Sequence, residues 1–600
     1  MPALKTNFFF KGTLFIAALG ALIYSNTFLN SFHFDDFPSI VNNASIRSFH
    51  ELYHVWGSEP TRFVTFFSFA LNYHWGGLNV CGYHIINLLI HVATSILVWR
   101  FMLLTPGSSP GVAFFTALIF LTHPLQTQAV NYIYQRAVLL AAFFYMASLG
   151  LYIKANRAWE SKISSPEGKF YYGGSLICAL LSLLSKENAV SLPLMICLYQ
   201  GLFFKEQNGF HWKKVIPFFL AILAIPLAWG VLNAQTLMGI KNTVEGLTSQ
   251  GLTVQQYSMT QVKVILTYLK LLVLPLHQRV EYDYTAVSSF FDVSVLGSAF
   301  LLLLIIGIAV ALRNRFRLLS FGIFWFFITL MPESSFWPNR DLIYEHRVYL
   351  PLVGFACFLS SGLFYIFRGQ RASLTIKILT IFVIAYSLLT FQRNKVWRDE
   401  FTLWDDAVHQ SPQSSRAYLN RGAAYQAAGD LDHAMQDYNM AIGLGPVETT
   451  ILSNRGLIFL KKGKLDLALA NFDLAIKINP SFVGTYVNRG KLYQMQGKLD
   501  QARQDLDRAI ELAPNNVGGY VARGMFEADI GDLRGAISDY NTALMIQPDN
   551  PVIYGDRAAV YYAQKDYSRS WQDVHKVESL GSGIKTQYLQ ALEKASGREQ

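Results

Sequence analysis

Residues 485–514, "TYVNRGKLYQMQGKLDQARQDLDRAIELAP", are one copy of a unit that recurs through the last third of the chain. Glycines return every 34 residues, at Gly422, Gly456, Gly490 and Gly524, and prolines keep the same spacing, at Pro446, Pro480, Pro514 and Pro548. A glycine on the first of two helices lets the second pack closely, and a proline ends the unit. The period therefore predicts stacked pairs of helices.

The period and the pattern are those of tetratricopeptide repeats. Four full repeats fit, and a weaker fifth follows at 554–580, where Ala558 replaces the glycine and Ser570 replaces the usual alanine. We expect the fifth repeat to cap the stack. The repeats predict a groove for an extended peptide or a partner domain. The alternative is a rigid cap or spacer without a ligand, because repeat architecture alone does not define a ligand.

The rest of the chain is suited to lipid. The whole sequence is 52% hydrophobic and 15% charged, with a mean hydropathy of +0.27, whereas soluble domains carry about 25% charged residues. Long apolar runs alternate with short polar joints as far as residue 392. We expect an all-α chain in four parts: a polytopic membrane domain at 1–392, a linker helix at 393–415, a repeat domain at 416–582 and a C-terminal tail at 583–600.

Eleven apolar runs are candidate membrane spans. They lie at 12–30, 84–104, 111–129, 134–153, 171–185, 188–204, 215–234, 294–312, 318–332, 348–367 and 374–391. A twelfth stretch, 260–276, carries Lys263 and Lys270 and is expected to lie along the outer interface. With the N-terminus inside, this arrangement keeps Arg313, Arg315, Arg317, Arg368 and Arg371 inside. We therefore expect eleven crossings and an outside C-terminus; twelve crossings with a cytoplasmic C-terminus are the alternative.

The net charge of +10 fits a positive-inside bias better than nucleic-acid binding, since no aromatic and basic residues interleave. The four cysteines form no CxxC pair, so neither a disulfide framework nor a structural zinc site is expected. No metal site is predicted, and a need for a divalent metal stays open.

Five polar joints, named here the outer joints, would then lie together outside. They are 31–83, 123–136, 185–188, 235–293 and 331–351. The first holds Asp35 and Asp36, in "SFHFDDFPSIVNN" (31–43). Adjacent side chains do not face one way, so one carboxylate is expected to point into a site while its neighbour orients or caps the local helix. An acid here suits a general base. Capping of a helix begun by Pro38 is the equal alternative.

The outer joints also supply cations: Arg62, Arg136, Lys186 and Arg347. Cations beside lipid are what a lipid phosphate or pyrophosphate leaving group needs, and snorkelling to head groups is the alternative for any one of them. His123, which precedes Pro124, is expected to make structural hydrogen bonds rather than to bind metal.

Several motifs occur in the order known from one family. They are "FHFDDFPSIVNN", "RFVTFFSFALNYHWGGLNVCGYHIINLLIHVATSILV", "HPLQTQAVNYIYQRA", "LLSKENAVSLPL", "EHRVYLPLVGF" and "QRNKVWRDEFTLWDDAV", followed by the repeats. Over nearly the whole chain the sequence resembles the transmembrane and tetratricopeptide-repeat proteins, a branch of the polytopic GT-C glycosyltransferases related to protein O-mannosyltransferases. The wording "SKENA" and "EHRVYLP" is closer to bacterial members.

This resemblance implies transfer of a sugar such as mannose, with inversion, from a polyprenyl-phosphate donor to a hydroxyl, on protein Ser or Thr. The reaction would take place on the extracytoplasmic side, periplasmic in a bacterium and lumenal in a eukaryote. It implies Asp35 as the base, with Asp36 as its neighbour. The cations near the donor phosphate would be Arg136, Lys186, Arg347 and, more weakly, Arg62. The residues that support the site or face the acceptor would be His123, Gln128, Glu187, Glu345 and His346. The implied partners are the lipid-linked donor, membrane lipids and an acceptor protein held by the repeats.

One departure bears on activity. Family members often have Glu where this chain has Gln128 in "HPLQTQAV", and an amide cannot take a proton or carry charge. Two other functions therefore stay open: an inactive membrane-anchored scaffold, and a transferase acting on glycan or lipid acceptors.

Overall fold

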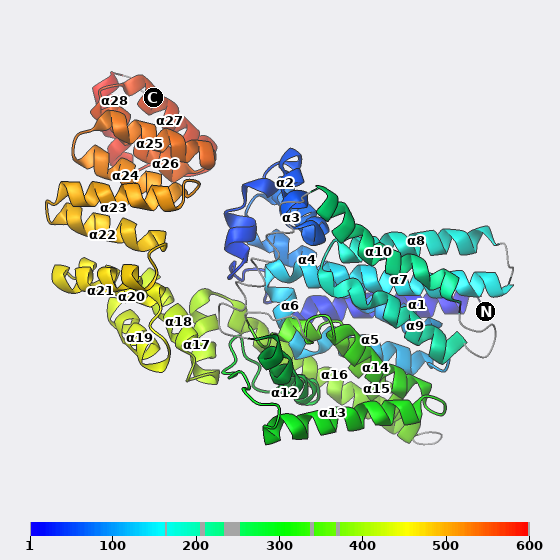
Figure 1. Cartoon of the computed structure of the whole chain (residues 1–600). Helices are drawn as coiled ribbons and strands as arrows, with labels where there is room; N and C mark the ends of the chain where they lie inside the picture. The colour runs from blue at the N-terminus through cyan, green and yellow to red at the C-terminus, as the bar shows by residue number, and fades with distance from the viewer. Residues whose placement is uncertain are drawn as a thin grey trace. The chain divides into compact units, whose positions relative to one another are not determined.

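The computed structural model describes residues 2–161, 165–204, 211–232, 253–335, 341–367 and 372–597, and in these ranges it contains helices and loops but no strand. The prediction of an all-α chain is confirmed. The chain divides into two compact units, Met1–Pro412 and Gln413–Gln600 (Figure 1).

The first unit is a bundle of long apolar helices with short helices in its loops. Its helices are α1 (Pro2–Ile23), α2 (Leu52–Ser58), α3 (Phe63–Gly76), α4 (Val80–Leu104), α5 (Pro110–Thr122), α6 (Thr127–Asn131), α7 (Arg136–Ser161), α8 (Pro166–Leu183), α9 (Leu192–Tyr199), α10 (Trp212–Leu232), α12 (Val254–Val273), α13 (Val293–Leu312), α14 (Arg317–Leu330), α15 (Pro351–Ile366), α16 (Ala372–Asn394) and α17 (Glu400–Gln410). The N-terminus lies at one end of α1, and α2 and α3 lie at the opposite end of the bundle (Figure 1).

A helix lies in each of the predicted spans. Among the described residues, four helical stretches are long and apolar enough to cross a membrane: Val80–Leu104, Ile133–Glu160, Val293–Leu312 and Ser373–Trp397. Shorter apolar helices are Phe9–Ile23, Pro110–Thr122, Arg317–Leu330 and Pro351–Ile366. The number of crossings and their direction stay predictions. Arg368, Arg371 and residues 235–252 and 336–340 of the outer joints lie outside the described residues.

Helix α12 occupies the stretch expected to lie along the interface. It buries Tyr257, Val264 and Tyr268, which share one face, while Lys270 on the other side is exposed. It is not among the helices that are long and apolar enough to cross.

The predicted span at 12–30 is wrong at its C-terminal end, because α1 ends at Ile23. The buried side chain of Asn394 donates hydrogen bonds to the Ile23 carbonyl (2.9 Å) and to Asn26 Oδ1 (3.1 Å). The first of these bonds satisfies a carbonyl at the end of α1 that would have accepted from a backbone N–H if the helix had continued.

The predicted span at 111–129 is interrupted. Helix α5 ends at Thr122, and His123 and Pro124 begin a new turn. Proline lacks an N–H and disfavours helical backbone at the residue before it, so helix α5 ends here and the chain turns.

The core of the first unit is close-packed and aromatic. Trp325 is fully buried, with its ring 6.1 Å from that of Tyr145 and 5.7 Å from that of Phe101. Where α14 and α15 meet, a Cβ on Gly322 would lie 2.6 Å from the Gly354 carbonyl oxygen. Small residues at this crossing therefore let the two helices approach closely.

The second unit is a solenoid of helix pairs (Figure 1). Its helices are α18 (Ser415–Ala427), α19 (Leu431–Leu444), α20 (Thr449–Lys461), α21 (Leu465–Ile478), α22 (Val483–Met495), α23 (Leu499–Leu512), α24 (Val517–Asp529), α25 (Leu533–Ile546), α26 (Pro551–Ala563), α27 (Tyr567–Ser579) and α28 (Thr586–Ser596). The recurring glycines lie where the paired helices touch: a Cβ on Gly456 would meet the Phe472 ring at 2.6 Å.

A line of arginines, named here the arginine ladder, joins the pairs. Arg421, Arg489, Arg523 and Arg557 each donate two hydrogen bonds, 2.7–2.9 Å long, to an aspartate 16 residues later: Asp437, Asp505, Asp539 and Asp573. Three of them also reach back 16 residues to the preceding pair, at Asp473, Asp507 and Asn541. Two-armed guanidinium–carboxylate bonds fix direction as well as distance, so they align the two helices of each pair. The backward bonds link neighbouring pairs.

Two segments differ from the predicted division. Residues 393–412, part of the predicted linker helix, belong to the first unit. In the predicted tail, α28 packs on α27 and buries Leu592 completely.

The fifth repeat carries a backbone penalty that the others avoid. The turn between its two helices holds Lys565 at φ 63°, whereas the equivalent Gly497 and Gly531 have φ 72° and 87°. A side chain in this left-handed region costs roughly 1–2 kcal/mol, part of which the entropy of glycine offsets. Lys565→Gly should therefore raise the free energy of unfolding by about 1 kcal/mol. Thermal unfolding of the purified full chain measures it, with Gly531→Ala as the control that should lose stability. A destabilised Lys565→Gly would contradict this account.

Candidate functional site

Side chains from all five outer joints meet at one end of the first unit. The hydrogen bonds and ion pairs that link them are Asp35–Tyr132, Asp36–Tyr134, Arg62–Glu187, Gln128–His346, Lys186–Glu333 and Gln278–Glu345. These joints are far apart in sequence, yet the packing of α4, α5, α7 and α16 brings them together. The side of the membrane that they face stays a prediction.

Asp36 is turned inward and serves the backbone. Its side chain is fully buried, and its two oxygens accept hydrogen bonds from the N–H groups of His33 (2.9 Å) and Tyr134 (2.7 Å). Burial raises the pKa of Asp36 to about 7, and these two N–H donors act in the opposite direction. Asp36 thus fastens the first outer joint to the second.

Asp35 is turned outward. The residue is exposed, and its Oδ2 accepts a hydrogen bond from the Tyr132 hydroxyl (2.6 Å), while its own N–H donates to the same hydroxyl oxygen (3.1 Å). Burial, followed by the negative charge of Asp35, raises the pKa of Tyr132, which keeps the phenol protonated as a donor. The carboxylate is therefore held in one orientation and remains accessible.

The turn that presents Asp35 is strained and braced. Phe34 has φ 46°, which is rare for a bulky side chain. Its ring lies 5.4 Å from Tyr132 and 5.3 Å from Trp404, and neighbouring His33 contacts Glu400 (2.8 Å) on α17. Such packing stabilises the strained conformation and fixes the direction of the following carboxylate.

Two cations of the outer joints, Arg62 and Lys186, are paired with acids. The Arg62 guanidinium lies 5.3 Å from the centre of the Tyr134 ring and contacts Glu187 (3.3 Å). The Tyr134 ring is in turn 6.3 Å from that of Tyr132. Lys186 contacts Glu333 (2.6 Å). Arg62 is therefore linked to Asp35 through the rings of Tyr134 and Tyr132. Lys186 adjoins Glu187 in sequence.

Arg347 is buried and braces its own loop. Its guanidinium donates to the carbonyl oxygens of Asp341 (2.9 Å) and Leu342 (3.1 Å) and approaches the Tyr257 hydroxyl (3.4 Å). Together with burial, its positive charge helps to lower the pKa of neighbouring His346.

His346 offers a polar atom without a partner. Its side chain is 7% exposed, and its Nδ1 has no hydrogen-bond partner among the described residues. Burial and the positive charges of Lys186, Arg347 and Arg62 hold the pKa of His346 well below its usual value. The ring is therefore neutral and suited to a hydrogen bond with an uncharged ligand group.

Gln128 acts as a hydrogen-bond acceptor, which its amide oxygen can supply. Its Oε1 accepts a hydrogen bond from the backbone N–H of His346 (2.7 Å). Glutamine and glutamate supply this acceptor equally well, so replacement of the common Glu leaves the joint intact. Glu345 is likewise structural: it is buried, burial raises its pKa, and it accepts from Gln278, the Arg279 N–H and Tyr282.

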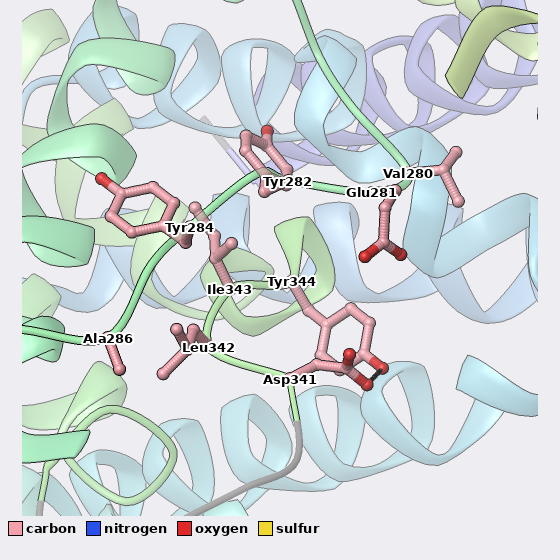
Figure 2. Close-up of a pocket in the computed structure, with 9 residues that line it drawn as sticks. All are labelled: Val280, Glu281, Tyr282, Tyr284, Ala286, Asp341, Leu342, Ile343 and Tyr344. Carbon is pink, nitrogen blue, oxygen red and sulfur yellow. Dashed lines mark hydrogen bonds between the residues drawn. The ribbon is translucent and has the colours of Figure 1, made fainter. Parts of the chain in front are cut away.

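A pocket of about 280 Å³ adjoins this cluster (Figure 2). It is lined by Val280, Glu281, Tyr282, Tyr284, Ala286, Asp341, Leu342, Ile343 and Tyr344. Glu281 and the hydrogen-bonded pair of Asp341 and Tyr344 lie on one side of it (Figure 2). The sequence did not predict this pocket or the hydrogen bond by which Tyr132 orients Asp35. The tyrosines of "EYDY" (281–284) and "NYIY" (131–134) are the features of the sequence that could have indicated them.

Arg136 does not join the other cations. It is 0% exposed, and it donates to Asn87 Oδ1 (2.7 Å), the Tyr83 carbonyl (3.0 Å) and the Ser68 carbonyl (3.2 Å). Its guanidinium carbon lies 4.7 Å from the centre of the Phe69 ring. The phosphate contact of Arg136 stays a prediction, and this geometry favours a structural role.

His123 is also buried in the scaffold. Its Nε2 contacts the Leu272 carbonyl oxygen (3.0 Å) and its Nδ1 accepts from the Leu125 N–H (3.3 Å), which are structural bonds of the expected kind. Among the described residues no group of three or more His, Cys, Asp and Glu side chains forms a metal site.

Family models described as TPR repeat and tetratricopeptide repeat match residues 456–497, 484–516 and 402–449. The predicted repeats are confirmed. A solved structure of a thermophilic TPR protein from Thermus thermophilus is 22% identical, with a TM-score of 0.28, over 31% of this chain and all of that chain.

Two relatives match most of this chain. A protein of Caenorhabditis elegans named protein O-mannosyl-transferase F38B6.6 is 25% identical over 73% of this chain and 63% of its own length. Protein O-mannosyl-transferase Tmtc3 of Drosophila melanogaster is 24% identical over 68% of this chain and 52% of its own length. The resemblance drawn from the motifs is confirmed, and the chain spans between half and two thirds of these relatives.

The burial of Arg136 predicts a fold defect when it is changed. Arg136→Lys should lower the free energy of unfolding by roughly 3 kcal/mol, because lysine cannot reach the three buried acceptors at once. Thermal unfolding in detergent measures this, and Arg62→Lys, a more exposed cation, is the control with a smaller loss. A variant that keeps wild-type stability yet no longer binds polyprenyl phosphate would return Arg136 to the phosphate site.

Asp36 should make stability depend on pH. Because its folded pKa is raised, the stability it contributes is full below pH 4 and is lost as pH rises through 7. Asp36→Asn removes this loss. Between pH 4 and pH 8 the free energy of unfolding of the variant should therefore rise relative to that of the wild type, by roughly 4 kcal/mol at most. Chemical unfolding of both proteins across this range measures the gain. Parallel stability profiles would refute the assignment.

Proposed function

We propose that this homologue of protein O-mannosyl-transferases moves a sugar, a hexose such as mannose, from a polyprenyl-phosphate donor to a hydroxyl of protein Ser or Thr on the extracytoplasmic face. The observation that carries the proposal is Asp35, an exposed carboxylate held by the Tyr132 hydroxyl and linked to the cation Arg62 through the neighbouring rings of Tyr132 and Tyr134. A base and a cation in one cluster suit transfer from a phosphate-linked donor.

The proposed step is one inverting displacement. Asp35 removes the proton of the acceptor hydroxyl as its oxygen bonds to the anomeric carbon. The bond from that carbon to the phosphate oxygen breaks on the opposite side, and its electron pair leaves with polyprenyl phosphate. The hydrogen bond from Tyr132 directs the carboxylate and leaves its second oxygen to take the proton.

The leaving phosphate would take over cations that now hold carboxylates. Arg62 and Lys186 are paired with Glu187 and Glu333 in this structure. A phosphate exchanges one anion for another at these cations, so binding need not pay the full desolvation of a bare charge. The neutral His346 ring is placed to hydrogen-bond an uncharged hydroxyl of the sugar or acceptor.

The repeats support a protein acceptor. Tetratricopeptide repeats suggest protein binding, and the named relatives are O-mannosyl-transferases. With eleven crossings and an inside N-terminus, the repeats and the outer joints would share the extracytoplasmic side. The lipid-linked sugar is the proposed donor substrate, and a need for a divalent metal stays open.

Asp35→Asn should lower transfer by roughly 10²–10⁴-fold, the usual effect of losing a general base. Tyr132→Phe should lower it by about tenfold, since one charge-assisted hydrogen bond is lost. Transfer of radiolabelled mannose from mannosyl polyprenyl phosphate to a Ser/Thr peptide, in membranes, measures both. Glu51→Gln, an exposed acid of the same joint beside His54, is the control with full activity.

Each other outcome identifies an alternative. Full transfer by Asp35→Asn would remove Asp35 as the base. No transfer by the wild type, with donor and peptide both present, would favour the scaffold. Transfer to glycan or lipid but not to peptide would replace the acceptor.

A further inference from the structure

A fifth arginine, Arg455, occupies the same position in its repeat as the four arginines of the ladder. We call each of these arginines with its partners a rung, and the rung of Arg455 differs from the other four. At this rung Arg455 meets Asn471 in place of an aspartate, and its Nε donates to Asn471 Oδ1 at 2.9 Å. The amide nitrogen of Asn471 is turned away and donates to the Leu467 carbonyl oxygen (2.7 Å). The second arm of the guanidinium bond, made elsewhere by Nη2, is therefore missing.

The same rung is neutral on its other side. Arg455 Nη1 donates to Asn439 Oδ1 (3.0 Å) in the preceding pair, where Arg489 meets Asp473 (2.6 Å) instead. Among the described residues, Arg455 therefore has no carboxylate partner and its Nη2 has no partner at all.

A half-buried cation without a counter-charge is unfavourable. Burial lowers the pKa of Arg455, whereas the hydrogen bonds that Arg489 and Arg557 donate to aspartates raise the pKa of these two arginines. A carboxylate from outside the chain would supply both the missing charge and the missing arm.

The surrounding repeat is positively charged. Residues 449–478 carry five basic residues, Arg455, Lys461, Lys462, Lys464 and Lys477, against two acids, Asp466 and Asp473. Residues 517–546, two repeats later, carry two basic residues against four acids. An acidic partner is therefore drawn to the second repeat rather than to the fourth.

We infer that Arg455 is a binding position for a carboxylate of an acidic segment of a partner protein. An Asp or Glu side chain of the partner accepts from Nη2 and completes the two-armed bond that the chain's own aspartates make on the other rungs. A carboxylate is planar and has two oxygens, so it can accept a hydrogen bond from Nη2 of Arg455 as the four equivalent aspartates do from their arginines. This inference does not depend on the proposed transfer reaction.

The test uses the purified full chain in detergent and a fluorescein-labelled 12-residue peptide of alternating Glu and Ser. The matched probe has Gln in place of Glu. Fluorescence anisotropy should show binding of the Glu peptide to the wild type, weakened by added salt. Arg455→Gln should weaken binding at least tenfold, and Arg534→Gln, an exposed cation of the fourth repeat, should leave it unchanged.

Asn471→Asp is the decisive variant. It keeps Arg455 and completes the rung within the chain, so it should raise the thermal midpoint and still weaken binding of the Glu peptide at least tenfold. Equal binding of the Glu and Gln peptides, no binding by the wild type at millimolar peptide, or unchanged affinity in Asn471→Asp would each overturn the inference. Displacement of the peptide by millimolar inorganic phosphate in the wild type but not in Arg455→Gln would replace the acidic segment with a phosphate ligand.

Discussion

The arrangement of the candidate site depends on one buried carboxylate. Asp36 accepts hydrogen bonds from the backbone of its own turn and from the backbone of Tyr134, about a hundred residues later. Buried backbone N–H groups must find acceptors, and here one side chain serves two chain segments. Because Asp36 turns inward, the adjacent Asp35 turns outward, and Tyr132, two residues before Tyr134, arrives beside it.

A second constraint is the balance of charge among the side chains of the outer joints. Arg62 and Lys186 are each held by a glutamate, and Arg347 is held by carbonyl oxygens. The site is thus a set of paired charges rather than a bare cationic surface. An unpaired buried charge costs more than a paired one, so the glutamates stabilise these cations without ligand, and a phosphate could replace an internal anion. His346 stays neutral because the same cations oppose its protonation.

The solenoid follows the same principle in a repeated form. Arg489 and Arg523 have carboxylates on both sides, so their buried charge is neutralised within the chain. Arg455 alone among the five rungs meets only amides there. Two Asp-to-Asn differences in sequence thus turn a structural rung into a charged position that a partner can satisfy.

The sequence by itself determined the elements whose cause is local. The 34-residue period, the long apolar runs and the amphipathic face of α12 are patterns that can be read along the chain, so they could be predicted without knowing any contact. The sequence also placed the outer joints and Asp35 among the candidates. It misplaced the ends at Ile23 and Thr122, where a distant asparagine and a turn at proline stop the helix.

Only the tertiary structure decided what each polar side chain does. Nothing in "HFDDF" says which aspartate is buried, because the answer lies in the N–H of Tyr134 and the hydroxyl of Tyr132. Arg136 and Gln128 depend in the same way on Asn87 and His346, remote in sequence. Hydrogen bonds are short and directional, so their partners are set by how helices pack, and a sequence pattern records only what neighbours along the chain share.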